Sequence, residues 1–231
     1  DEIAAKRGID PVAFRLELLK NTPRARKVVE TVARMADWGR KRDGRGMGFA
    51  FIDYSGSLLA GAAEVSLDRA SGQIKVHNFW CAIDCGVAVQ PDNVAAQSEG
   101  SIVYGLGVAL TERITVRNGQ VEQSNFYDYH IPRLNEVPRM HIEVIQTDNH
   151  PTGAGQMTTP LVAPAISAHC WSSQLWMAEF MSVVVASVRM RLLRPLCSGG
   201  CCSAFSARTV QLRRLGPARG ASLLQALCRT S

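Results

Sequence analysis

A glycine- and proline-rich segment, residues 150–168, places chemically useful side chains at a defined spacing. In order, the segment carries Pro151, Gly153, Gly155, Gln156, Pro160 and Pro164. Glycine and proline hold such a connection on one backbone path, and loops of this kind often carry binding residues on a rigid scaffold. The pattern predicts a loop that faces a ligand, with Gln156 directed toward it.

A second informative segment is Gln97-Ser98-Glu99-Gly100, inside a predicted helix at 91–112. That helix also contains Gly105 and Gly107. Each interior glycine lowers helix stability by about 1 kcal/mol relative to alanine. Three glycines in one helix favour the close approach of a neighbouring backbone or of a ligand. Tight packing of the helix on a sheet explains them equally well.

Other candidate sites are weaker. The five histidines form no HxxxH pair or metal triad, and we expect each to be an ordinary strand or loop residue. Cys85 follows Asp84, but no base accompanies it, so a buried loop cysteine is the better interpretation. The glycine-rich stretch at residues 44–48 lacks the lysine that a phosphate-binding loop requires. The cysteines at 197–202 lack the second pair or the histidines that a zinc site needs.

Helices are predicted at the start of the chain and strands after it. Gly8 is expected to end a first helix, Asp10 to cap a second, and Thr22 to cap a third that ends at Gly39. Residues 46–56, 58–68 and 72–84 have strand patterns, as do 141–146. Asn118-Gly119 suits the type I′ turn of a hairpin at 114–123. The fold class expected is therefore α+β.

Composition is that of a globular protein with a core, and no segment is long and apolar enough to be a transmembrane span. The chain begins at Asp1 rather than Met, so we expect the natural N-terminus to be missing. The net charge of +6 would favour a nucleic-acid partner. However, residues 169–231 carry +7 and residues 1–168 carry −1, so the basicity belongs to the tail alone. We therefore expect no nucleic-acid partner.

Several segments of residues 1–168 resemble a known family. They read, in order, DEIAAKRGIDPVAFRLELL, EVSLDRASGQIKVHNFWCAIDCGVAVQPDNVAAQSEGSIVYGLGVALTE, VRNGQVEQSNFYDYHIPRLNEVPRMHIEVI and PTGAGQMTTPLVAPAISA. They are similar to the C-terminal part of the molybdopterin-binding large subunit of the xanthine dehydrogenase/aldehyde oxidase family, and most of all to the isoquinoline 1-oxidoreductase beta-subunit type. The resemblance covers residues 1–168 almost continuously and implies the C-terminal portion of a molybdenum-cofactor-binding domain.

The resemblance implies a molybdenum hydroxylase, which inserts a water-derived oxygen into an aldehyde or N-heterocycle. It also implies a molybdopterin cofactor with molybdenum, in the cytosine dinucleotide form, and [2Fe–2S] clusters on a separate small subunit. The absence here of iron–sulfur cysteine spacing agrees with that division. No metal-ligating side chain is expected, because the pterin holds the metal. The compartment stays open between bacterial cytoplasm and periplasm.

Residue by residue, Gln97 matches the family's QxEG segment, where the amide contacts the pterin, and Gly100 allows its close approach. Gly153 and Gly155 match the glycines of the family's G-x-G-E loop. The glutamate of that loop is the general base. Here the position holds Gln156, whose amide cannot accept the proton, and general-base catalysis contributes about 10²–10⁴-fold. The resemblance therefore implies an impaired enzyme, unless the Gln codon is a sequence error.

After Ala168 the resemblance stops. Residues 169–231 contain eight arginines, no lysine, one acidic residue and five of the seven cysteines. We interpret this as a frameshifted, poorly ordered tail; a genuine basic interaction tail is the alternative. For the whole chain, the alternative to an impaired hydroxylase fragment is a truncated or pseudogene product that binds no cofactor.

Overall fold

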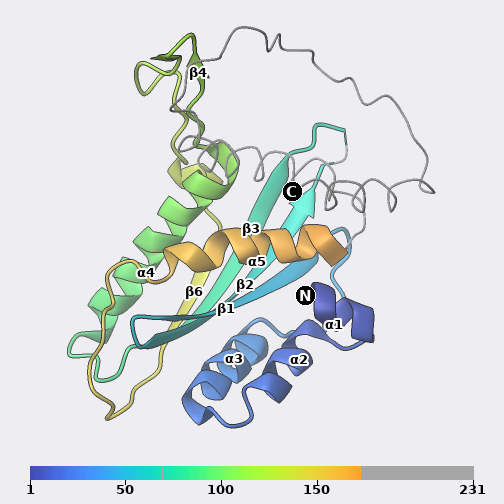
Figure 1. Cartoon of the computed structure of the whole chain (residues 1–231), viewed down its shortest axis with the longest axis vertical. Helices are drawn as coiled ribbons and strands as arrows, with labels where there is room; N and C mark the ends of the chain where they lie inside the picture. The colour runs from blue at the N-terminus through green and yellow to red at the C-terminus, as the bar shows by residue number, and fades with distance from the viewer. Residues whose placement is uncertain (69, 173–231) are drawn as a thin grey trace, which may run out of the picture. The chain divides into compact units, whose positions relative to one another are not determined.

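A four-stranded mixed sheet is the centre of the structure, a computed structural model that describes residues 1–68 and 70–172 (Figure 1). Its strands are β1 (Gly46–Tyr54), β2 (Ser57–Leu67), β3 (Ile74–Asp84) and β6 (Arg139–Val144), in the order β1-β2-β3-β6. The first three are antiparallel, and β6 is parallel to β3. The helices and the mixed sheet confirm the α+β prediction. Residues 173–231 of the predicted tail lie outside the described residues, and residues 169–172 form the last turn of α5 (Thr159–Ser172).

Short turns explain why β1, β2 and β3 form a meander. Ser55 and Gly56 have φ of 54° and 84°, the pair of left-handed conformations that a type I′ hairpin requires. The next turn is closed by hydrogen bonds between Asp68 and both Gly72 and Gln73. A parallel partner such as β6 needs a long crossover instead. That crossover contains α4 (Pro91–Leu106) and a hairpin of β4 (Val116–Arg117) and β5 (Gln120–Val121).

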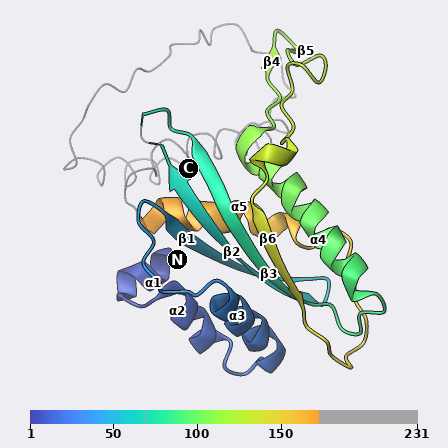
Figure 2. The ribbon, with the colours of Figure 1, turned by 180° about the vertical axis from the view of Figure 1, so that it is seen from behind.

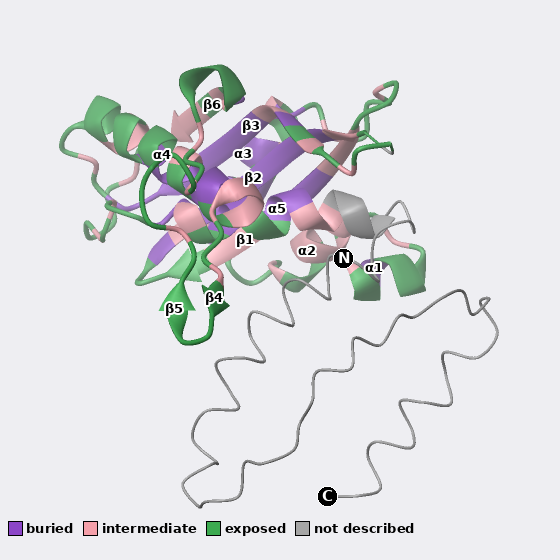
Figure 3. Cartoon of the chain, turned by 90° about the horizontal axis from the view of Figure 1, so that it is seen from above, coloured by how far each residue is buried: buried purple, intermediate pink, exposed green. Residues whose placement is uncertain are grey.

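Helices cover both faces of the sheet because side chains alternate along its strands. On β2, Leu59 and Ala63 lie in one core cluster, together with buried residues of α4 and of α5 (Thr159–Ser172). Ala60 and Ala62 lie in the other, together with residues of α2 (Pro11–Leu18) and α3 (Pro23–Met35). Among the described strands, β2 and β3 are consequently the most buried, whereas the β4–β5 hairpin is exposed (Figure 3).

The first two helix ends follow the predicted signals. Gly8, at φ 66°, ends α1 (Glu2–Arg7), and an Asp10 side-chain oxygen accepts the amides of Val12 and Ala13 at 2.9 and 2.8 Å. Both agree with prediction.

The predicted start of the third helix is confirmed, since Thr22 is the N-cap and Pro23 the first residue of α3. The Thr22 side chain makes no capping hydrogen bond, because its hydroxyl donates to the Leu19 carbonyl at 3.1 Å. The predicted end is wrong, since the helix ends at Met35 rather than Gly39. Asp37, at φ 45°, adopts the left-handed conformation before the chain reaches that glycine.

The predicted hairpin is confirmed, with Asn118 at φ 50° and Gly119 at φ 80°. The helix predicted at 91–112 is confirmed as α4, followed by one π-helical turn (Gly107–Thr111). No helix among the described residues is long and apolar enough to cross a membrane.

The expectation of a proline-rich loop through residue 168 is wrong from Thr159 onward, where α5 begins and runs across the sheet (Figures 1 and 2). Pro160 stands in its first turn, where no backbone donor is needed. The apolar side chains then recur on one face and are buried: Leu161, Val162, Ala165 and Ile166. This burial stabilises the helix despite the interior Pro164.

The glycines of α4 differ in their surroundings. A Cβ at Gly105 would lie 2.6 Å from Val162 Cγ2 and 3.0 Å from the Thr159 carbonyl oxygen, so α4 and α5 meet closely there. At Gly100 a Cβ would meet nothing within 4 Å. Close protein packing therefore explains Gly105, whereas Gly100 leaves room on an exposed surface.

We expect Gly105→Ala to lower the free energy of unfolding by about 1–3 kcal/mol, because the added methyl overpacks the α4–α5 contact. Gly100→Ala, on the same helix, should leave it unchanged or raise it by up to about 1 kcal/mol through helix propensity. Urea unfolding of both variants measures the difference. Equal effects of the two substitutions would contradict this packing.

Candidate functional site

The connection from β6 to α5 runs along the chain that follows β3. The Thr152 amide donates to the Cys85 carbonyl at 2.8 Å, and the Val87 amide donates to the Asn149 carbonyl at 3.0 Å. Gly86, at φ 76°, packs directly against the His150 carbonyl, where a side chain would collide with backbone. These contacts join two loops that lie far apart in sequence.

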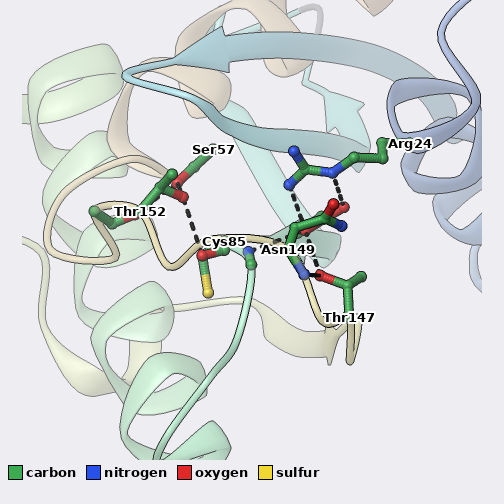
Figure 4. Close-up of polar contacts among 9 residues, drawn as sticks. Arg24, Ser57, Cys85, Thr147, Asn149 and Thr152 are labelled. Carbon is green, nitrogen blue, oxygen red and sulfur yellow. Dashed lines mark hydrogen bonds and ion pairs between the residues drawn. The ribbon is translucent and has the colours of Figure 1, made fainter.

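A buried carboxylate supports this junction. Asp84, at the end of β3, is 1% exposed and accepts two hydrogen bonds from the Arg24 guanidinium at 2.9 and 2.8 Å. The Gly86 amide donates to it at 3.0 Å, and Thr147 of the β6–α5 connection lies within 3.5 Å (Figure 4). Burial alone would raise the pKa of Asp84, but the Arg24 and Gly86 hydrogen bonds outweigh it and hold the pKa below its ordinary value.

Residues 153–156, hereafter the glycine loop, lie at the protein surface beside α4. Gln97, predicted as a ligand-binding residue from a separate motif, donates its side-chain amide to the Gly155 carbonyl. The Ser101 hydroxyl lies 3.5 Å from the same carbonyl oxygen. The structure therefore brings together Gln97 and Gly155, which are 58 residues apart in the chain.

The surface around this contact is open. Gly100, Gly153, Gly155, Gln97 and Gln156 are all exposed. A Cβ would meet nothing within 4 Å at Gly100 or Gly155, and only the Met157 sulfur, at 3.9 Å, at Gly153. Bare backbone and side-chain amides, which both donate and accept hydrogen bonds, suit the polar edge of a planar heterocycle.

Gln156 is held at its backbone, where its carbonyl accepts the Thr159 amide at 3.3 Å at the start of α5. Within the described part of the chain, its side chain makes no hydrogen bond to another residue. An amide there can orient a ligand but cannot take up a proton. No group of three histidine, cysteine or acidic residues that could hold a metal occurs among the described residues.

The alternative nucleophile at Cys85 is not supported. Its thiol is buried, and burial raises its pKa. Burial also raises the pKa of Cys81, to about 12. Histidines 77, 130 and 141 each contact a different partner: Ser66, Glu136 and Asn78.

No sequence pattern pointed to the residues that hold the junction: Arg24, Ser57, Asp84, Thr147 and Thr152. Each is a common polar residue with no motif of its own. The one available signal was a carboxylate at the end of an apolar strand.

Comparison with known proteins identifies the family. Residues 20–138 match the molybdopterin cofactor-binding domain, and the match spans just over half of the chain, so the chain belongs to this family. The match confirms the resemblance to the molybdopterin-binding subunits of the xanthine dehydrogenase/aldehyde oxidase family.

Among individual relatives, the beta subunit of isoquinoline 1-oxidoreductase from Brevundimonas diminuta is 40% identical over 171 residues, covering 72% of this chain and 22% of the relative. A nicotinate dehydrogenase subunit from Pseudomonas putida is 28% identical over 186 residues, covering 72% and 16%. The crystal structure of quinoline 2-oxidoreductase from Pseudomonas putida 86 is similar at a TM-score of 0.44 and 28% identity, covering 49% of this chain and 15% of that one. The chain thus spans between 15% and 22% of the length of these three proteins.

We expect Asp84→Asn to lower the free energy of unfolding at pH 7 by about 3 kcal/mol, because it leaves Arg24 without its charged partner. A loss of about 3 kcal/mol is at the low end of the cost of breaking a buried ion pair, because the Arg24 side chain is 37% exposed. The lowered pKa of Asp84 means that its stabilisation is present above about pH 4 and is lost as the pH falls through the folded-state pKa.

The difference between wild type and Asp84→Asn should therefore be smaller at pH 3 than at pH 7, as measured by urea unfolding. Asp148→Asn, at an exposed position of the same connection, is the control and should change stability by less than about 0.5 kcal/mol. A deficit of equal size at both pH values would rule out the ion pair as its source.

Proposed function

We propose that this chain forms one side of the molybdenum-cofactor site of a molybdenum hydroxylase large subunit. The observation that carries the proposal is the contact between Gln97 and the Gly155 carbonyl. Two motifs that the family resemblance assigns to the same cofactor site meet at this contact, on an exposed surface with bare glycine backbone on either side.

In this proposal, Gln97, Gly100, Gly153 and Gly155 bind the pterin. Gln97 offers amide hydrogen bonds to its polar edge, and the glycines let the ring system approach backbone that a side chain would cover. The bound cofactor supplies the redox chemistry that no side chain provides. The chain's own task is to bind and orient it.

Gln156 occupies the position of the proton acceptor. An amide does not ionise in the accessible pH range, so Gln156 can hydrogen-bond a substrate or a water but cannot act as the general base. We therefore propose that the chain supports little or no turnover as written, while its cofactor-binding surface is retained. The competing proposal is a chain that binds no cofactor. It is also favoured by Gln156 standing where the family has glutamate.

The proposed substrate is an aldehyde or an N-heterocycle. The relatives named after isoquinoline, nicotinate and nicotine support the heterocycle, and an abscisic-aldehyde oxidase of Arabidopsis thaliana supports the aldehyde. The proposed partner is a small subunit that carries two [2Fe–2S] clusters, and the proposed cofactor form is molybdopterin cytosine dinucleotide.

Cofactor binding is tested with the full chain, purified from a host that makes the dinucleotide, by metal analysis and by fluorescence of the oxidised pterin. Gln97→Ala should reduce retained pterin about five- to tenfold, the equivalent of one lost hydrogen bond. Gln90→Ala, at the N-cap of α4, is the matched control and should retain it. Wild-type chain without pterin or molybdenum would refute the proposed function in favour of the non-binding alternative.

The role of position 156 is tested by Gln156→Glu in the chain assembled with its cofactor and the iron–sulfur subunit. Turnover should rise by about 10²–10⁴-fold, because a carboxylate can accept the proton. The gained activity should fall as the pH drops through the carboxylate pKa, near 4–5. Gln156→Asn keeps an amide and should gain nothing. No gain for Gln156→Glu in a molybdenum-replete preparation would remove position 156 from the proton transfer.

A further inference from the structure

Ser57 is a fully buried hydroxyl between the sheet and the glycine loop. It is the first residue of β2, directly after the hairpin turn, and is 0% exposed. Its Oγ donates to the Gly153 carbonyl at 2.7 Å and lies 2.5 Å from the Thr152 hydroxyl (Figure 4). The Thr152 hydroxyl also lies 3.0 Å from the Cys85 carbonyl, so its single proton serves either that carbonyl or Ser57 Oγ. The two hydroxyls thus join β2, the end of β3 and the loop.

The glycine loop is consequently held at two carbonyls from two sides. Ser57 of the sheet holds Gly153, and Gln97 of α4 holds Gly155. Only Ala154 separates these two points, and Gln156 follows the second. Glycine has unusual backbone freedom, so a loop with two glycines needs such contacts to keep one conformation.

We propose that Ser57, together with Thr152, is a positioning residue that fixes the glycine loop and so sets where the side chain of residue 156 lies. The inference rests on the proposed function of that loop. Neither side chain is proposed to contact the cofactor itself, and both act through the backbone of the loop. Precise placement matters because a displacement of about 1 Å at a reacting group can cost 10²-fold in rate.

Hydrogen exchange of the full chain, followed by mass spectrometry, tests this placement without any cofactor. Ser57→Ala removes the donor, and Thr152→Val removes the second hydroxyl with little change of shape. The amide of residue 152, which donates to the Cys85 carbonyl at 2.8 Å, should exchange about tenfold faster in both variants, since the Gly153 carbonyl or the Ser57 hydroxyl loses its partner. Peptides from β1 and β3 should be unchanged.

Two matched controls separate positioning from general stability. Thr152→Ser keeps the hydroxyl and should preserve slow exchange in the loop. Ser66→Ala removes a comparable hydrogen bond, to His77 at 2.7 Å, near the other end of β2, and should leave the loop unchanged. Unchanged loop exchange in Ser57→Ala, or equal acceleration in Ser66→Ala, overturns the proposal.

A second readout connects the anchor to position 156. In the cofactor-loaded Gln156→Glu enzyme, Ser57→Ala should lower kcat about tenfold or more with little change in KM, because the base rather than the substrate contact is displaced. An unchanged kcat overturns the positioning role. Failure of the proposed function is recognised separately, as absence of pterin from the wild-type chain, and the exchange experiment still decides whether Ser57 holds the loop.

Discussion

The parallel pairing of β6 with β3 is the constraint on which the rest of the structure depends. Parallel neighbours end at the same edge of a sheet, so the connections that follow them must run side by side. The chain after β3 leads into α4, and the chain after β6 leads into α5. One pairing therefore brings Gln97 and the glycine loop to the same surface, although α4, a hairpin and a strand separate them in sequence.

The junction at this edge is polar, and it is stable because every buried polar group there has a partner. The Asp84 carboxylate is neutralised by Arg24 and held by the Gly86 amide, while the Ser57 and Thr152 hydroxyls hold loop carbonyls. An unpaired buried carboxylate would be strongly destabilising. The paired Asp84 carboxylate holds Arg24 of α3 against the end of β3 and lies within reach of Thr147. The proposed cofactor surface therefore depends on residues that do not belong to it.

Membership of the molybdopterin cofactor-binding family places the unusual residue in context. Gln156 does not disturb the fold around it: the glycine loop is anchored and α5 begins normally three residues later. Exchanging a carboxylate for an amide removes an ionisable group and leaves the shape of the side chain almost unchanged. In the proposed site, cofactor binding and proton transfer are therefore separable.

The sequence by itself determined the α+β class, most element positions, the family and the two motifs that meet at the site. These follow from local physics: side-chain periodicity, Asp10 and Gly8 at helix ends, and an Asn-Gly turn. It misplaced the C-terminal end of α3 and missed α5. Asp37 took the left-handed conformation expected of Gly39, and burial of Leu161 and Val162 overrode the prolines. Only the tertiary structure decided that Gln97 contacts Gly155 and that Ser57 holds Gly153, because a strand pairing across the sheet brings these residues together and no local pattern encodes it.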